Sequence, residues 1–264
     1  MPFPLEGYPL AAAVSPRLQV VETTGSTNAD LVAAAAADGE EWPHLSVLLT
    51  TDQRAGRGRL DRTWTTPPGT ALAVSVLVRV PDVPAPARGW IPLVAGAAMT
   101  RAVMDQLRGT GHTAGLKWPN DVLLDGGKVS GILAEVVPGD PTAVVIGAGV
   151  NTRMSRADLP IETATSFAAA GLEVDDDRLL AEYLRALDEQ LGALAFAHGD
   201  AAAAGILGEL EALCTTIGSE VVVSLPDGTK LSGRAQRIDS EGRLVVADGD
   251  VETAVSAGDV VHVR

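Results

Sequence analysis

The sequence has little cysteine and no long apolar run. These two absences argue against a disulfide-bonded secreted protein and against a membrane-spanning protein. Cys214 is the single cysteine in 264 residues, so no internal disulfide can form and a reducing, cytoplasmic setting is expected. No apolar run approaches the roughly 18 residues that a membrane span needs. The segment MPFPLEGYPLAAAV at the start contains three prolines and no basic residue, which argues against a secretory signal. We therefore expect a cytoplasmic protein that acts away from membranes.

Basic residues are also scarce, which limits the partners. The formal net charge is −14, and a nucleic-acid backbone favours a positively charged protein, so general binding to nucleic acid is not expected. The four histidines show no metal-ligand spacing, which argues against a zinc site. Lysine is much rarer than arginine: of the 20 basic residues, only Lys117, Lys128 and Lys230 are lysines. Because an ammonium acts as a compact point charge, the first two are candidates for a binding site.

Arginine, by contrast, is concentrated in one segment, which we name the arginine loop (residues 54–64, RAGRGRLDRTW). Its basic residues are Arg54, Arg57, Arg59 and Arg62. Glycines at positions 56 and 58 would let backbone N–H groups approach an anion closely. The spacing matches neither a Walker A motif nor a dinucleotide-binding fingerprint. The loop indicates an anion site; the alternative that stays open is a solvated turn whose arginines pair with surface carboxylates.

Hydrophobic periodicity predicts an α+β chain with a large and a small domain. Up to Cys214 the pattern mixes strands and helices, whereas afterwards short β-branched runs are separated by the turn sequences PDG, SEG, DGD and AGD. The second pattern is typical of a small β-barrel, so we place the boundary near Thr216, giving domains 1–216 and 217–264. The predicted strands cover 18–22, 45–51, 70–80, three segments within 115–137, and 142–151. The predicted helices cover 28–37, 91–107, 175–196 and 203–214.

Two local patterns add detail to these elements. Thr27 and Asp30 have the spacing of a capping box at the start of the alanine-rich helix. In the predicted strand 70–80, every second residue from Leu72 to Val80 is leucine or valine, and the residues that alternate with them are Ala71, Ala73, Ser75, Leu77 and Arg79. We therefore expect this strand to have one clearly apolar face.

Four segments, in order, carry a resemblance to a known family. They are GSTN from Gly25, DQRAGRGRLDRTW from Asp52, KWPNDVLLDGGKVSGILAE from Lys117, and IGAGVN from Ile146. Together they resemble the biotin–protein ligases over residues 21–151, and the β-rich tail is similar to the small C-terminal domain of that family. The resemblance implies a mixed-sheet catalytic domain of the biotin/lipoate ligase type, followed by a small SH3-like β-barrel.

The activity that this resemblance implies has two steps. ATP and biotin react to give biotinyl-5'-AMP and pyrophosphate, and the biotinyl group then passes to a lysine of a biotin carboxyl carrier domain. Mg²⁺ is implied as a cofactor, with its ligands left open. Some members of the family also carry an N-terminal DNA-binding domain. Because about twenty residues precede the first motif strand, we expect the enzyme-only form, without DNA as a partner.

The resemblance also implies roles for individual residues. The residues expected at the ureido ring of biotin, a group with two N–H donors and one carbonyl, are Ser26, Thr27, Asn28 and Gln53. The expected catalytic residues are Lys128, Arg57, Arg59 and Asp121. The biotin side is completed by Arg57, Gly58, Arg59, Lys128, Gly131 and Gly147. Glycines on this wall are expected to leave room for the ligand.

The nucleotide side is implied in the same way. The expected contacts are Arg59, Arg62, Trp64, Lys117, Asn120, Asp121 and Asn151. Asp121 has two possible tasks, since it could orient the attacking lysine amine or help to hold Mg²⁺. Trp64 could equally belong to the hydrophobic core.

Two alternatives remain at this stage. A lipoate–protein ligase shares the fold and the adenylate chemistry but takes an aliphatic acyl chain. A non-catalytic sensor of biotin or nucleotide would bind the same ligands without releasing pyrophosphate. Pyrophosphate release with biotin and ATP separates an enzyme from a sensor, and competition with lipoate separates the two ligases.

Overall fold

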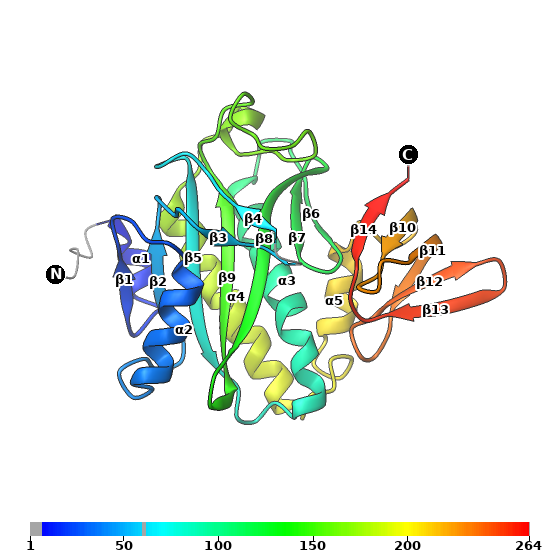
Figure 1. Ribbon diagram of the computed structural model, residues 1–264, viewed down its shortest axis with the longest axis horizontal. Helices are drawn as coiled ribbons and strands as arrows, with labels where there is room; N and C mark the ends of the chain where they lie inside the picture. Colours follow the sequence, from blue (N-terminus) through cyan, green and yellow to red (C-terminus); the bar gives the residue numbers. More distant parts are fainter. Residues whose placement is uncertain (1–6, 60–61, 264) are drawn as a thin grey trace.

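The computed structural model describes residues 7–59 and 62–263, which form a large mixed sheet and a smaller antiparallel sheet beside it (Figure 1). The order of the large sheet is β1-β2-β5-β9-β8-β7-β6, with β1 and β2 parallel and the other neighbours antiparallel. Its strands are β1 (Leu18–Val20), β2 (Ser46–Thr50), β5 (Ala71–Arg79), β6 (Ala114–Lys117), β7 (Asp121–Leu124), β8 (Gly127–Val137) and β9 (Asp140–Asn151). The predicted mixed-sheet α+β class is confirmed.

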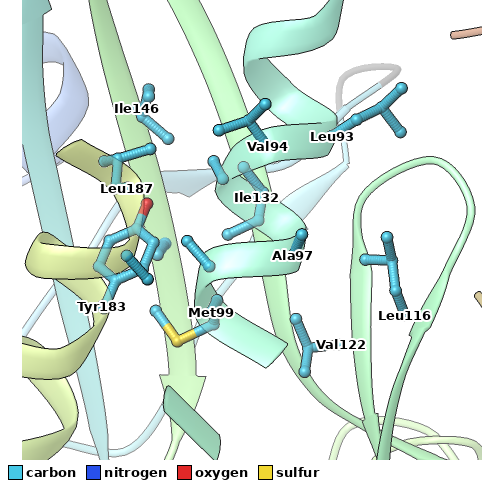
Figure 2. Packing of buried hydrophobic residues seen from close by; sticks show 14 of the residues in the cluster. Leu93, Val94, Ala97, Met99, Leu116, Val122, Ile132, Ile146, Tyr183 and Leu187 are labelled. Carbon is cyan, nitrogen blue, oxygen red and sulfur yellow. The ribbon is translucent and has the colours of Figure 1, made fainter. Parts of the chain in front are cut away.

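Helices cover both faces of this sheet and create two hydrophobic cores. The helices are α1 (Pro9–Ala12), α2 (Thr27–Ala37), α3 (Ile91–Gln106), α4 (Asp176–Phe196) and α5 (Ile206–Leu213), with short 3₁₀ turns at Ala85–Trp90 and Ala168–Ala170. Figure 2 shows part of the larger core, where side chains of α3, α4 and the sheet pack together. The smaller core is formed under α2 by Leu31, Leu48 and Val145, among others. None of the described helices has the length and apolar character that a bilayer crossing requires.

Strand β5 has the apolar face that was expected, and its other face is also buried. Val76 and Val78 belong to the larger core, whereas Leu77 between them belongs to the smaller core. Successive side chains of a strand point to opposite faces, so β5 is buried on both sides. The expected apolar face is present, and the opposite face is buried as well, because β5 lies in the middle of the sheet with helices above and below it.

Two helices begin at different residues from those expected. Ser26, not Thr27, is the N-cap of α2, and its Oγ accepts a hydrogen bond from the Ala29 N–H at 3.4 Å. Asp30 is engaged by Thr24 instead of completing a capping box with Thr27. Helix α5 starts three residues later than predicted because Gly205 adopts a left-handed conformation with φ of 76°.

The smaller sheet is formed by β10 (Glu220–Ser224), β11 (Lys230–Ile238), β12 (Leu244–Asp248), β13 (Val251–Val255) and β14 (Asp259–His262). Its order is β13-β12-β11-β10-β14, and in the described part of the chain no pairing joins β13 to β14. The expected closure into a barrel is thus not present, although the antiparallel strands are. Only Val255 of β13 is buried, so few apolar side chains draw this strand toward the core, and the β12–β13 hairpin projects outward (Figure 1).

Candidate active site

One large cleft, of about 1740 Å³, contains all the residues predicted for the site. Its walls come from the start of α2, the arginine loop, strands β6–β9, the segment that follows β9, and strand β14 of the smaller sheet. The predicted residues that line it are Ser26, Thr27, Asn28, Gln53, Arg57, Gly58, Arg59, Arg62, Trp64, Lys117, Asn120, Asp121, Lys128, Gly131, Gly147 and Asn151. Predicted residues from Ser26 to Asn151, which are far apart in the sequence, therefore converge on one site.

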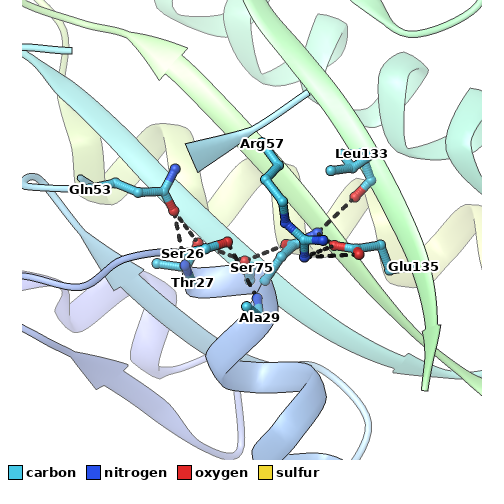
Figure 3. Close-up of polar contacts among 9 residues, drawn as sticks. Ser26, Thr27, Ala29, Gln53, Arg57, Ser75, Leu133 and Glu135 are labelled. Atoms are coloured by element: carbon cyan, nitrogen blue, oxygen red, sulfur yellow. Dashed lines mark hydrogen bonds and ion pairs between the residues drawn. The ribbon is translucent and has the colours of Figure 1, made fainter. Parts of the chain in front are cut away.

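One end of the cleft is a buried set of uncharged polar side chains that we name the neutral pocket (Figure 3). Its members are Ser26, Thr27, Asn28, Gln53 and Ser75. The backbone N–H and the hydroxyl of Thr27 both donate to Gln53 Oε1, at 2.9 and 3.1 Å. Ser75 Oγ lies 2.8 Å from Thr27 Oγ1 and 2.6 Å from Asn28 Oδ1. The pocket is therefore held together by its own hydrogen bonds.

The orientation of these hydrogen bonds determines what the pocket can offer a ligand. Because Gln53 Oε1 accepts twice, the Gln53 amide N–H groups stay available as donors. The Asn28 amide N–H groups are engaged by Leu133 O at 3.3 Å and Glu135 Oε2 at 2.8 Å, which leaves Asn28 Oδ1 as the acceptor beside Ser75. A ligand that combines N–H donors with a carbonyl acceptor matches this arrangement.

The other end of the cleft is the cationic wall, which we define as Arg57, Arg59, Arg62, Lys117 and Lys128. Within the arginine loop, β3 (Gly56–Arg57) pairs with β4 (Thr63–Trp64). Arg57 Nη2 donates to both oxygens of Glu135, at 3.0 and 3.1 Å, and Arg62 forms an ion pair with Asp259 of β14 at 2.5 Å. Arg54 pairs with Asp52 and does not line the cleft. The predicted alternative of arginine–carboxylate pairing is thus correct for three arginines, two of which still face the cleft.

Arg59 differs from the other arginines of the loop. It donates to Asn120 Oδ1 at 2.9 Å and to the Gly258 carbonyl at 3.3 Å, and no described carboxylate lies within ion-pair distance of it. Burial lowers the pKa of Arg59, while the charges of Asp121 and Asp259 act in the opposite direction. Arg59 is therefore a half-buried cation held by neutral groups, which suits it to an incoming anion.

Lys128 and Asp121 form the central ion pair of the wall. Lys128 Nζ lies 2.5 Å from Asp121 Oδ1, and both side chains are largely buried, at 35% and 18% exposure. The two residues come from adjacent strands, β8 and β7, joined by the predicted Gly-Gly turn. A Cβ added to Gly131 would lie 3.1 Å from Lys128 Nζ, so the absence of a side chain at Gly131 leaves the space that the lysine occupies. This arrangement fixes an ammonium group at the middle of the cleft.

Glycines on strand β9 serve protein side chains directly. A Cβ on Gly147 would lie 2.4 Å from Asn28 Oδ1, and one on Gly149 would lie 2.6 Å from the Trp64 ring. The room beside Gly147 was expected to be for ligand, but Asn28 fills it. Trp64 is half-buried against this strand and lines the cleft. Asn151 donates through Nδ2 to the Thr165 carbonyl at 2.9 Å and so holds the segment after β9 against the wall.

The smaller sheet contributes a side of the cleft that the sequence did not predict. Burial acts to raise the pKa of Asp259, but Arg62, with the charges of Lys117 and Arg59, outweighs it and the pKa lies below its usual value. His262 Nε2 lies 3.2 Å from Thr216 Oγ1, which also accepts from the Trp118 N–H at 3.0 Å. Burial and the charge of Lys117 lower the pKa of His262. The last strand is therefore part of the site.

Ser75 and Glu135 are two further site residues missed from the sequence. Each is a polar residue within a strand whose neighbours are mainly apolar, and that contrast was the available signal. Asp259 and His262 carried no such signal, because β14 is short and lies in the other sheet. Cys214 lies outside the lining of the cleft, and burial raises the pKa of its thiol.

Comparisons with known proteins agree with this architecture. The biotin/lipoate A/B protein ligase family model matches residues 20–151, and the model of the biotin protein ligase C-terminal domain matches residues 216–263. The biotin–[acetyl-CoA-carboxylase] ligase of Mycobacterium tuberculosis is 41% identical over 94% of this chain and 90% of its own length. The bifunctional ligase/repressor of Escherichia coli is 31% identical over 79% of this chain and 63% of its own length.

A solved structure gives the same fold. The biotin protein ligase of Aquifex aeolicus, in complex with biotin and ATP, superposes with a TM-score of 0.74 at 23% identity, covering 94% of this chain and 99% of that one. At this identity the likeness concerns the fold alone. The matched models span most of both sheets, and the Mycobacterium relative is similar along nearly the whole chain. The chain therefore belongs to the biotin/lipoate A/B protein ligase family.

Proposed function

We propose that this chain is a biotin–protein ligase, which activates biotin with ATP and transfers the biotinyl group to a lysine of a biotin carboxyl carrier domain. The observation that carries the proposal is the continuity of the neutral pocket and the cationic wall within one cleft. A ligand with an uncharged hydrogen-bonding ring at one end and a carboxylate at the other fits both ends. Biotin is such a molecule.

The neutral pocket is assigned to the ureido ring. Gln53 Nε2 and the Ser26 hydroxyl supply donors for the ring carbonyl, and Asn28 Oδ1 supplies an acceptor for a ring N–H. Thr27 and Ser75 hold these groups in place through the bonds between them. Gly58, Gly131 and Gly147 line the path from this pocket toward the cationic wall.

The cationic wall is assigned to the activation step. The biotin carboxylate attacks the α-phosphorus of ATP, the bond to the β-phosphate oxygen breaks, and pyrophosphate leaves. Both reactants are anions, and two unit charges 4 Å apart repel by about 4 kcal/mol at an effective dielectric constant of 20. Lys128, Arg57 and Arg59 offset this repulsion and stabilise the charge of the transition state. Lys128 is the residue we place nearest to the reacting atoms.

The nucleotide is assigned to Arg62, Trp64, Lys117, Asn120 and Asn151, with Arg59 and Asp121 at the phosphates. Mg²⁺ is part of this proposal. In the described residues no group of three His, Cys, Asp or Glu side chains converges on one point. A magnesium ion held mainly by phosphate oxygens needs only one or two carboxylates, and Asp121 is the carboxylate in the middle of the cleft. Bound there, Mg²⁺ would neutralise part of the phosphate charge.

The transfer step needs no enzyme nucleophile. The neutral amine of the carrier lysine attacks the acyl carbon of biotinyl-5'-AMP, AMP leaves with the bonding electrons, and the amine releases a proton. A thioester route through Cys214 is disfavoured because the thiol is buried outside the cleft lining and its pKa is raised. With a single, buried cysteine in the chain, we propose a cytoplasmic setting for the reaction.

The two alternatives are separated by the pocket and by one experiment. An aliphatic lipoyl chain would leave the polar groups of the neutral pocket without partners, which is costly in a buried site. The test incubates the protein with ATP, Mg²⁺, radiolabelled biotin and a biotin carrier domain, with lipoate as competitor. Biotin-dependent pyrophosphate release and labelling of the carrier that lipoate does not reduce are expected. Binding without pyrophosphate release would identify a sensor instead.

We also propose the domain boundary near Thr216, with domains at 1–216 and 217–264. The smaller sheet begins at Glu220, and two buried tryptophans of the larger part donate to its β11–β12 turn: Trp90 to Ser240 O at 3.3 Å and Trp118 to Gly242 O at 3.1 Å. A chain ending at residue 216 is expected to fold, to bind biotin, and to lose nucleotide affinity because Asp259 and His262 are gone. Circular dichroism and biotin and ATP titrations test this, and an insoluble product would move the boundary.

A further inference from the structure

Glu135 is a charged residue in the middle of an otherwise mostly apolar strand, and it contacts both ends of the cleft. It lies on β8, where its neighbours Ala134 and Val136 are apolar. Its Oε2 accepts from Asn28 Nδ2 at 2.8 Å, and both of its oxygens accept from Arg57 Nη2. Figure 3 shows this carboxylate next to the guanidinium of Arg57. A carboxylate can accept several such bonds at once because it offers two oxygens with four lone-pair directions.

The arginine loop has few other attachments in its first half. Backbone bonds fix its start, from Arg54 N to Thr24 O at 2.9 Å and from Ala55 N to Gly25 O at 2.7 Å. Beyond that point the β3–β4 ladder contains only two residue pairs. So short a ribbon contributes little order by itself. The contact of Arg57 with Glu135 is thus a second anchor, made by a side chain from the large sheet.

The same carboxylate determines how Asn28 is oriented. Asn28 can present either its oxygen or its amide nitrogen toward Ser75, and only the first choice accepts the Ser75 hydroxyl. The nitrogen donates to Glu135 at 2.8 Å and, more weakly, to the Leu133 carbonyl at 3.3 Å, and the oxygen is directed to the neutral pocket. Glu135 therefore acts on the chemistry of the pocket as well as on the position of the loop.

We infer that Glu135 is a positioning residue that couples the neutral pocket to the arginine loop, so that the pocket and the loop are organised together. This rests on the proposed function for the identity of the ligand, but the coupling itself is a property of the protein alone. Charge-assisted hydrogen bonds are stronger than neutral ones, and here one acceptor group serves a donor from each side.

Glu135→Gln is the discriminating variant because it preserves size. A glutamine has one acceptor oxygen and one donor nitrogen. Its oxygen can accept from Asn28 or from Arg57, and its nitrogen, which cannot accept, then points toward the donor group of the other residue. Glu135→Asp retains the charge at a shorter reach and should recover part of the function. Glu252→Gln is the matched control, since Glu252 forms a two-point pair with Arg237 at 2.7 and 2.8 Å in the smaller sheet, outside the cleft.

The experiment has two arms on the full chain. Limited trypsin digestion without substrates, followed by mass spectrometry, reports cleavage after Arg57, Arg59 and Arg62. Steady-state pyrophosphate release reports the KM values for biotin and ATP. For Glu135→Gln we expect cleavage about 10-fold faster and a biotin KM about 10-fold higher, the factor for one hydrogen bond to a charged group. The ATP KM should change by less than about 2-fold, and the values for Glu135→Asp should lie between those of Glu135→Gln and the unaltered protein.

Both arms must respond for the inference to hold. Digestion or biotin KM values equal to those of Glu252→Gln would overturn it. A loss spread evenly over both KM values, kcat and the melting temperature would also overturn it, because that pattern describes a merely structural residue. If the unaltered protein releases no pyrophosphate with biotin and ATP, the proposed function fails, and the digestion arm together with a direct biotin titration still decides the role of Glu135.

Discussion

The neutral pocket and the cationic wall meet in one cleft but are stabilised in different ways. The five side chains of the neutral pocket are no more than 8% exposed and bond mainly to one another. In the cationic wall, the Arg57 and Arg62 side chains are 52% and 60% exposed, and each is paired with a carboxylate from another element. The pocket is thus held together by hydrogen bonds between buried neutral groups, whereas the wall is held by ion pairs of partly exposed cations.

This difference explains how so acidic a chain can maintain an anion site. Four like charges close together destabilise a folded loop unless other charges offset them. Glu135, Asp259 and Asp121 supply these offsets from three separate strands. A phosphate or carboxylate that enters the cleft then competes with protein carboxylates for the same cations. Recognition by the wall should therefore depend on ionic strength, and recognition by the pocket should not.

Among these predictions, removal of Lys128 should have the largest effect, and it should impair the function of the cationic wall without impairing the neutral pocket. Lys128→Ala should lower the rate of adenylate formation by roughly 10²–10³-fold, the scale for loss of one preorganised donor at a developing charge. Lys128→Arg should also be poor, since the planar fork is larger than the ammonium that fits beside Asp121. Biotin binding in the absence of ATP should change far less. Pyrophosphate release and biotin titration measure the two effects.

The control for this prediction is Lys230→Ala, which removes the third lysine from an exposed position in the smaller sheet. It should leave both measurements unchanged. Near-normal pyrophosphate release from Lys128→Ala would remove Lys128 from the mechanism.

Much of the division of the cleft into a neutral pocket and a cationic wall was predictable from the sequence, because the motif residues lie close to one another along the chain. The segments GSTN and KWPNDVLLDGGK bring their own turn residues, and the predicted strand–turn–strand–turn–strand over 115–137 is confirmed as β6, β7 and β8. Arg57 and Lys128 were likewise visible as unusual residue choices. Such local features predicted which residues gather in the cleft.

The partners of those residues were not predictable, because they come from distant segments. Arg57 pairs with a residue 78 positions away, and Arg62 with one 197 positions away. Thr27 suited a helix cap equally well by local criteria, and only Gln53 and Ser75 show that its hydroxyl is used in the pocket. The apolar face of β5 was predicted correctly, but the burial of its other face was not, because the sequence does not reveal that helices cover both sides of the sheet.

A single hydroxyl in the neutral pocket provides the next test. Thr27→Val keeps the shape but removes the group that donates to Gln53 and accepts from Ser75. Biotin affinity should fall about 10-fold, the cost of leaving buried polar partners unsatisfied, while ATP affinity stays the same. Isothermal titration at low and high salt measures both. Thr27→Ser restores the hydroxyl and should restore affinity; equal losses in both variants would contradict a hydroxyl-based pocket.

Arg59 belongs to the cationic wall and contacts the smaller sheet at Gly258, and its removal should affect retention of the intermediate. Arg59→Gly loses the contacts to Asn120 and Gly258 O and adds backbone freedom to the loop. We expect biotinyl-5'-AMP to escape and label a bystander such as serum albumin several-fold above the unaltered protein, as measured by blotting for biotin. Arg54→Gly is the matched control, since Arg54 belongs to the same loop but not to the cleft. Labelling confined to the carrier would show that Arg59 does not retain the adenylate.

The smallest expected effect concerns the free energy of unfolding. Its dependence on pH should differ between the cationic wall and the neutral pocket. The pKa of Asp259 lies below its usual value, so its pair with Arg62 stabilises the fold above about pH 4 and this contribution disappears as the pH falls through the lowered pKa. Because Arg62 is 60% exposed, Asp259→Asn should cost less than about 1 kcal/mol at pH 7, and the cost should be smaller at about pH 3. The Thr27→Val cost involves no titrating group and should be the same at both values. Urea unfolding at the two pH values compares them, and a pH-independent cost for Asp259→Asn would mean that the carboxylate stabilises the fold by packing, not through its charge.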